Sequence, residues 1–122
     1  MTWRVRDHGF QMTLGREVPD LIRTHLAPWM EGWLSKSGLQ RSDIATWAVH
    51  PGGPAILTGV RDALGIKNED LKASWEVLRH HGNMSSPTIL FVLDYLMKAD
   101  APRPCVALGF GPGLAIEAVL FR

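Results

Sequence analysis

Two segments of this sequence carry side chains that can stabilise a negatively charged oxygen. Residues 47–54, Trp-Ala-Val-His-Pro-Gly-Gly-Pro, place His50 after an apolar stretch and before two glycines. Residues 82–86, Gly-Asn-Met-Ser-Ser, place Asn83 beside a glycine and ahead of another apolar stretch. An imidazole and a carboxamide are a pair that can hold an enolate oxygen by hydrogen bonds. Because the sequence contains no plausible nucleophile to accompany them, it predicts half of an active site.

Each of these segments also has a purely structural interpretation. His50 could be an ordinary turn histidine, with the Pro-Gly-Gly after it marking the passage from strand to helix. Asn83 could adopt a left-handed or capping conformation, with Ser85 as part of a helix cap. Residues 109–113, Gly-Phe-Gly-Pro-Gly, could bring backbone N–H groups close to a substrate or could simply form a tight hairpin turn. For such short motifs the structural interpretation is the more common one, and locally both stay open.

The single cysteine, Cys105, is a poor candidate for the missing nucleophile. It opens an apolar strand with no helix N-terminus after it, so nothing in the sequence should lower the pKa of its thiol. We expect a buried, structural cysteine. His80 and His81 are adjacent and would point in different directions on a helix, and no cluster of residues has zinc spacing, so we predict no metal site.

The composition suits one ordinary globular domain covering residues 1–122. Of the 122 residues, 46% are hydrophobic and 20% are charged, enough for one core with two layers. The net charge of +1 gives no field that would attract nucleic acid or an anionic membrane. The apolar run at residues 89–93 is far too short to span a bilayer, and no signal peptide is visible. With one cysteine and so no internal disulfide, a cytoplasmic location is the default expectation.

The elements that must position these side chains follow from hydrophobic periodicity and turn residues. Alternation at residues 3–6 and 10–14 predicts a strand interrupted near Gly9 by a bend or bulge. Apolar residues at helical spacing predict a helix that opens near Glu17, is kinked or broken at Pro28 and ends at Gly38. The remaining expected elements are a strand at 45–50, helices at 55–64, 68–81 and 88–98, and strands at 105–110 and 114–121.

This order of elements, β-α-β-α-α-α-β-β, predicts an α/β fold with a mixed sheet and helices packed on it. His50 then lies at the carboxyl end of a strand, where ligands collect in open α/β sheets. The helix at 88–98 is apolar almost all round, so we expect it to be the central buried helix.

Taken together, residues 47–57, 82–86 and 109–114 closely resemble the type III polyketide synthases, the chalcone and stilbene synthases of the thiolase fold. The order, spacing and identity of these motifs match, and the resemblance runs over nearly the whole chain. It implies a Cys-His-Asn triad in which His50 is the histidine and Asn83 the asparagine. In the family, this pair stabilises the enolate left when malonyl-CoA loses carbon dioxide, and the histidine also activates the cysteine. The resemblance implies acyl-CoA and malonyl-CoA as substrates, with no further cofactor.

The resemblance also implies which residues line the substrate path. Ala55 matches a backbone contact to the pantetheine arm of CoA, and Ser85 matches a position in the starter pocket. Met12 takes the place of a gatekeeper phenylalanine, and its flexible thioether departs from the plant pattern. The loop at residues 111–113 lines the cavity where chain length and cyclisation are decided. The full set expected to line the substrate and CoA path is Met12, Gly52, Gly53, Ala55, Ser85, Phe110, Gly111, Pro112 and Gly113.

The family's catalytic cysteine and main CoA-phosphate cations lie in an N-terminal half that this sequence does not contain. We therefore expect the chain to be the C-terminal portion of a condensing enzyme, inactive alone. Without the other half a broad apolar face should be exposed, so the expected partners are that half and a second copy of the chain. The alternative is a stand-alone, non-catalytic thiolase-like module that acts in dimerisation or protein interaction.

Overall fold

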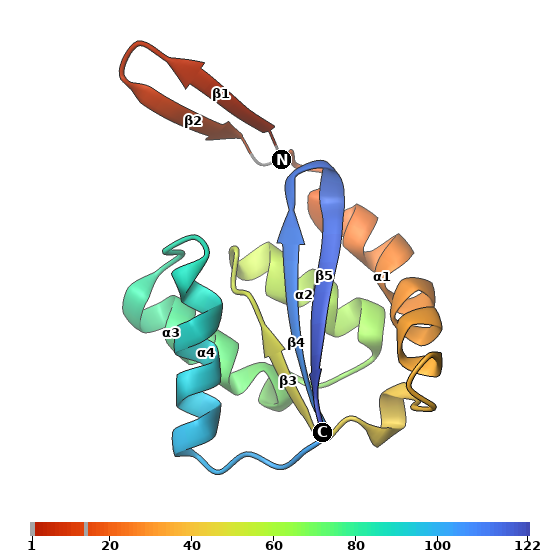
Figure 1. Ribbon diagram of the computed structural model, residues 1–122. Coiled ribbons are helices and arrows are strands. Elements are labelled where there is room, and N and C mark those ends of the chain that lie inside the picture. The colour runs from red at the N-terminus through yellow and green to blue at the C-terminus, as the bar shows by residue number, and fades with distance from the viewer. Residues whose placement is uncertain (1, 14) are drawn as a thin grey trace.

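The computed structural model describes residues 2–13 and 15–122, except for the side chain of Met12. Figure 1 shows a body of helices around a small sheet, from which an N-terminal hairpin projects. In chain order the elements are β1 (Thr2–Arg6), β2 (Gly9–Thr13), α1 (Val18–Ser35), β3 (Thr46–Val49), α2 (Pro54–Leu64), α3 (Lys72–His81), α4 (Pro87–Lys98), β4 (Cys105–Gly111) and β5 (Ala115–Phe121). Short 3-10 turns occupy Arg41–Asp43, Asn68–Leu71 and Pro112–Leu114.

The central sheet has three strands in the order β3-β4-β5. β3 runs parallel to β4, with Thr46 opposite Cys105 and Val49 opposite Leu108. β4 and β5 form an antiparallel hairpin in which Gly109 lies opposite Glu117. The mixed sheet predicted from the sequence is therefore confirmed. All four residues of β3 are buried, which requires cover on both faces of the strand.

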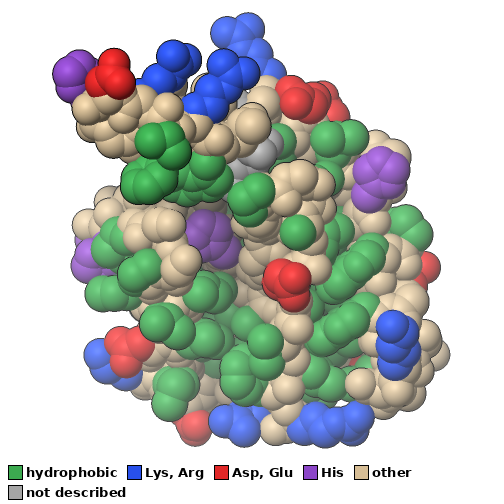
Figure 2. Space-filling view, turned by 45° about the horizontal axis from the view of Figure 1, so that its top comes forward, with side chains coloured by type: hydrophobic (Ala, Val, Ile, Leu, Met, Phe, Trp, Pro, Cys, Tyr) green, Lys and Arg blue, Asp and Glu red, His purple; other side chains and the backbone are tan. Residues whose placement is uncertain are grey.

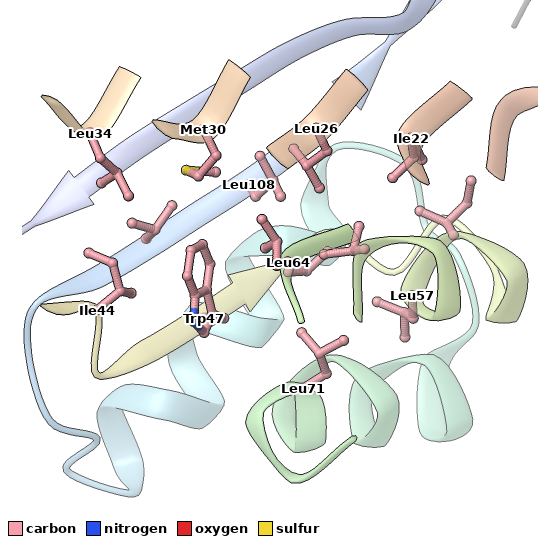
Figure 3. Packing of buried hydrophobic residues seen from close by; sticks show 14 of the residues in the cluster. Ile22, Leu26, Met30, Leu34, Ile44, Trp47, Leu57, Leu64, Leu71 and Leu108 are labelled. Atoms are coloured by element: carbon pink, nitrogen blue, oxygen red, sulfur yellow. The ribbon is translucent and has the colours of Figure 1, made fainter. Parts of the chain in front are cut away.

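Alternate residues of β3 and β4 pack against different pairs of helices. One face, with Trp47 and Leu108, packs against α1 and α2, and α1 contributes a row spaced four residues apart. Figure 3 shows part of this row, Ile22, Leu26, Met30 and Leu34, pointing toward the sheet. On the other face, small residues such as Ala48 and Ala107 pack against α3 and α4. The helices thus sandwich the sheet and fix β3 between them.

At the N-terminus the structure has two strands where the sequence predicted one bent strand. β1 and β2 pair antiparallel, with Arg6 opposite Gly9 and Thr2 opposite Thr13. Asp7 and His8 form the turn, and Gly9 after them has φ +123°, a conformation that glycine adopts without steric cost, so the chain reverses instead of bending. The prediction of strand periodicity was right and the predicted topology of this segment was wrong.

One predicted helix boundary differs in the structure, and one of two predicted alternatives is excluded. α1 is a single helix with Pro28 inside it, so of the predicted kink or break the break is excluded. The third predicted helix begins at Lys72 instead of Asn68, because residues 68–71 form a 3-10 turn. Asp70 closes that turn by accepting a hydrogen bond from the Lys67 N–H at 2.8 Å, so Asn68 is not the cap.

The expectation that the helix now seen as α4 would be fully buried is wrong for this chain. Only Thr88 and Val92 are buried, whereas Leu90 is 63% and Met97 76% exposed. A helix that is apolar all round needs cover on every side, and within the described residues α4 packs mainly on α3, β3 and β4. Within the described residues its outer face is uncovered. No helix in residues 2–13 and 15–122 is long and apolar enough to cross a membrane.

Substitutions at Gly59 of α2 and Gly32 of α1 can measure how closely these two helices pack. A Cβ on Gly59 would lie 3.2 Å from the Pro19 carbonyl oxygen, whereas a Cβ on Gly32 would meet nothing within 4 Å. We expect Gly32→Ala to raise the free energy of unfolding by about 0.5–1 kcal/mol, because alanine favours helix over glycine. Gly59→Ala should raise the free energy of unfolding much less, or lower it, because the added Cβ would crowd the Pro19 carbonyl. The thermal unfolding midpoints of both variants measure this, and equal gains would contradict the packing described.

Candidate active site

His50 is the first residue beyond the carboxyl end of β3, as the sequence predicts. Its backbone N–H donates to the Leu108 carbonyl at 2.8 Å, which extends the β3–β4 pairing by one residue. Gly109 lies behind the side chain, since a Cβ there would be 3.9 Å from the His50 Cβ. The imidazole is half-buried, and this burial lowers the pKa of His50. The ring is therefore held neutral at ordinary pH, with one N–H to donate.

Asn83 is presented by the loop that follows α3. Gly82 ends the helix with φ +68°, which turns the chain toward the carboxyl end of the sheet. The Asn83 Nδ2 donates to the Gly52 carbonyl at 3.3 Å, and its Oδ1 accepts from the Ser85 N–H at 2.9 Å. The two bonds fix the orientation of the carboxamide. Because Nδ2 carries two hydrogens, one remains for an oxygen of a ligand.

One cleft of about 690 Å³ brings His50 and Asn83 together. The turn at Gly52 links them, since its N–H donates to the His50 carbonyl at 3.0 Å and its carbonyl accepts from Asn83. Figure 2 shows a histidine in a hollow bordered by hydrophobic side chains. Seven predicted site residues line the cleft: His50, Gly52, Asn83, Ser85, Phe110, Gly111 and Pro112.

The remaining predicted residues are not among those that line this cleft. Gly53 precedes α2 and Ala55 is exposed in its first turn. Gly113 is exposed in the turn between β4 and β5, with φ +72°. The side chain of Met12 lies outside the described part of the chain, although its backbone pairs with Trp3. The predicted roles of these four residues stay predictions, as do the roles of the seven that line the cleft.

Several lining residues were missed by the sequence analysis. Trp3 of the hairpin and Ile89 of α4 contribute apolar walls. Glu117 contributes a carboxylate from β5, opposite Gly109 in the register. Strand alternation places Glu117 and Val119 on one face of the hairpin, so the period of β5 was the available signal. No sequence signal places Trp3 there, because its position depends on how the hairpin meets the body.

Cys105 lies far from this cleft, as expected for a structural cysteine. It is buried at the start of β4, opposite Thr46, whereas Gly109 lies beside His50. Four residues of strand separate them by about 13 Å. Burial raises the pKa of the Cys105 thiol, so it stays protonated. Within the residues that the structure describes, no three His, Cys, Asp or Glu residues are placed to hold a metal ion.

Comparison with known proteins identifies the family. The model for chalcone and stilbene synthases, C-terminal domain, matches residues 1–122. The 1,3,6,8-tetrahydroxynaphthalene synthase of Streptomyces peucetius subsp. caesius is 40% identical over 123 residues, covering 98% of this chain and 33% of that protein. The crystal structure of PKS-I from the brown alga Ectocarpus siliculosus has a TM-score of 0.94 and 33% identity, covering 98% of this chain and 34% of the other. CsyB complexed with CoA-SH has a TM-score of 0.86 and 29% identity over 98% of this chain and 35% of the other.

The fold identifies the class of protein, and the sequence similarities identify the family. The mixed sheet between helices is a thiolase-like α/β fold, as predicted. The chain belongs to the chalcone and stilbene synthase family of type III polyketide synthases and corresponds to their C-terminal domain. The chain spans about a third of the length of the relatives it matches. The resemblance stated from the sequence is thus confirmed.

The lowered pKa of His50 predicts how stability depends on pH. An unfolded histidine titrates near pH 6.5, and folded His50 titrates lower. As the pH falls through this window the unfolded state takes up the proton first, so stability should decline. Above the unfolded pKa His50 contributes no slope. Unfolding midpoints measured from about pH 8 to about pH 5 should show a smaller decline for His50→Gln than for the wild type. If the unfolding midpoints of the wild type and His50→Gln change in parallel with pH, burial does not shift the pKa of His50.

Proposed function

We propose that this chain is the C-terminal part of a CoA-dependent decarboxylative condensing enzyme and supplies the histidine and asparagine of a Cys-His-Asn triad. The observation that carries the proposal is the convergence of His50 and Asn83 on one cleft in a chain of this family. The relative from Streptomyces is described as a tetrahydroxynaphthalene synthase, which supports a biosynthetic polyketide product. The substrates proposed are an acyl-CoA starter and malonyl-CoA.

In the proposed reaction the two donors act where negative charge develops. Loss of carbon dioxide from a malonyl thioester breaks the bond to the carboxylate, and the electron pair moves onto the thioester oxygen as an enolate. The free hydrogen of Asn83 Nδ2 and the N–H of neutral His50 would hold that oxygen. Such donors stabilise the charge strongly because they are already oriented and partly shielded from water. The enolate carbon then attacks the carbonyl carbon of the cysteine-bound acyl group, which forms a carbon–carbon bond, breaks the carbon–sulfur bond and releases the cysteine thiolate.

The walls of the cleft suit a growing acyl chain. Ile56, Ile89 and Phe110 give it an apolar lining, and His50 and Asn83 are among its few polar groups. The structural relative CsyB is described in complex with CoA-SH, which supports a CoA ester as the substrate class. We retain Ala55 as a pantetheine contact and Gly53 as a residue lining the substrate and CoA path. We also retain Met12 and the loop at 111–113 as determinants of starter and chain length.

The nucleophilic cysteine is proposed to come from an N-terminal half. Cys105 is buried and about 13 Å along its strand from the residue beside His50, so it cannot reach the cleft. The exposed apolar side chains of α4 and β5, including Leu90, Met97 and Val119, are the surface we expect that half to cover. A homo-oligomer and a cytoplasmic location remain part of this proposal.

The proposal predicts different defects for the two donors. In the full-length protein, Asn83→Ala should slow carbon dioxide release from malonyl-CoA by roughly a hundredfold, typical for an oxyanion donor, while starter loading on the cysteine persists. His50→Ala should impair both steps, because it also activates the thiol. Radiolabelled loading measured beside carbon dioxide release separates them.

Asn68→Ala is the matched control for this comparison. Asn68 is exposed and bonds Arg61 outside the cleft, so both activities should stay near the wild-type values. Equal loss of both activities in the two site variants, with the fold intact, would mean that the division of roles is wrong.

The surface proposed for the N-terminal half is testable by association. Leu90→Glu places a charge on the outer face of α4 and should weaken binding of a separately produced N-terminal half. His25→Glu, on exposed α1 across the sheet, should not. Co-elution on size exclusion measures binding. The isolated chain should form no polyketide from acyl-CoA and malonyl-CoA, and robust product would refute the proposal. Failure of the halves to associate would favour the stand-alone interaction module.

A further inference from the structure

A buried hydroxyl on α3 holds the strand end from which His50 emerges. Ser74 is fully buried. Its Oγ donates to the Val49 carbonyl at 2.7 Å and accepts from the Val49 N–H at 3.1 Å. A serine hydroxyl has one donor and two acceptor positions, so both bonds can form together. Ser74 thus pairs both backbone polar groups of the residue that immediately precedes His50.

Val49 needs these bonds because its polar groups point away from the sheet. The N–H of His50 turns toward β4, where it donates to Leu108. Successive residues of a strand turn these groups to opposite edges, so those of Val49 face the open edge of β3. Val49 is fully buried, and water cannot replace the missing strand there. The Ser74 hydroxyl therefore stands in for a neighbouring strand at this point.

The same helix, α3, also leads to the second candidate donor, Asn83. α3 ends at His81, and Gly82 leads directly to Asn83. Through Ser74, the helix that presents Asn83 is bonded to the strand that presents His50. On the cleft side, the hydrogen bond that joins the two loops in the described part of the chain runs from Asn83 Nδ2 to the Gly52 carbonyl, at 3.3 Å. The shorter hydrogen bond, from Ser74 to Val49, lies one residue before His50 and joins α3 to β3.

We propose that Ser74 is a positioning residue that sets the place of His50 relative to Asn83, an inference that rests on the proposed roles of those two side chains. Ser74 does not touch substrate. Its loss would free the Val49 peptide to shift at the open edge, and His50 with it. A displacement of about 1 Å in a reacting group can cost on the order of a hundredfold in rate.

The test compares Ser74→Ala with a control at the other end of the same strand. Thr46 is buried too, and its Oγ1 donates to the Pro102 carbonyl at 2.6 Å. In the full-length protein, Ser74→Ala should lower kcat for malonyl-CoA decarboxylation at least tenfold, with KM nearly unchanged, because a transition-state contact is misplaced. Thr46→Ala should lower the unfolding midpoint similarly but keep kcat within about twofold. Ser74→Thr keeps the hydroxyl and should restore most of kcat.

A readout that needs no catalysis separates this inference from the proposed function. Diethyl pyrocarbonate acylates neutral imidazole, and mass spectrometry locates the product on His50. Ser74→Ala should raise the modification rate of His50 severalfold, and Thr46→Ala should not. If the wild-type protein does not decarboxylate malonyl-CoA, the proposed function fails while this labelling still decides the role of Ser74.

The outcomes that overturn the inference are specific. Wild-type kcat or wild-type His50 labelling in Ser74→Ala would do so, as would equal losses of kcat in Ser74→Ala and Thr46→Ala. If Ser74→Ala does not fold, Ser74→Cys replaces it, since a thiol has nearly the same shape and bonds weakly. Its kcat should then lie well below the wild-type value, and an unchanged kcat counts against Ser74.

Discussion

The rest of this structure depends on one short strand that has no access to water. Every residue of β3 is buried, so each of its backbone N–H and C=O groups must find a partner inside the protein. β4 satisfies one edge, and Ser74 satisfies the other edge at Val49. Helices must also cover both faces, which places α1 and α2 on one side and α3 and α4 on the other. His50 leaves this buried strand directly into the cleft, which explains its half-burial and its lowered pKa.

In contrast to β3, α4 has an apolar outer face that is exposed. Its inner residues contact the sheet, yet Leu90 and Met97 lie on the surface. A hydrophobic face of this kind is unusual in a monomeric soluble domain and indicates a binding surface. Figure 2 shows hydrophobic side chains spread over the centre of one face, with one acidic side chain among them and the other charged groups nearer the edges.

Much of the fold could be predicted from the sequence because its signals are local. The row of apolar residues in α1 and the Pro54 and Gly65 boundaries of α2 follow from periodicity and backbone preference. His50 and Asn83 could be paired only through the resemblance to a family, since local patterns left both interpretations open. Ser74 could not be found this way, because its place depends on the strand edge that it meets, which is a tertiary fact. The alternation of β5 was a local signal for the face that Glu117 takes, but its place opposite Gly109 depends on the register of β5 on β4. The prediction of one bent strand around Gly9 failed for a similar reason, because alternating apolar residues fit a bend and a chain reversal equally well.

On the proposed function, the Asn83 loop is a charge-stabilising site whose donor is oriented by contacts within this chain. Ser85 has φ +65°, a strained conformation for a non-glycine residue that costs roughly 1–3 kcal/mol. That conformation aims its N–H at Asn83 Oδ1, which leaves Nδ2 to face Gly52 and the cleft. The donor is thus oriented before any substrate arrives and needs no reorganisation when charge develops. A thiol supplied from another part of the protein has no such internal support. On the proposed function, the contact that brings the thiol to His50 is therefore the adjustable part of the site, and it depends on the surface of α4.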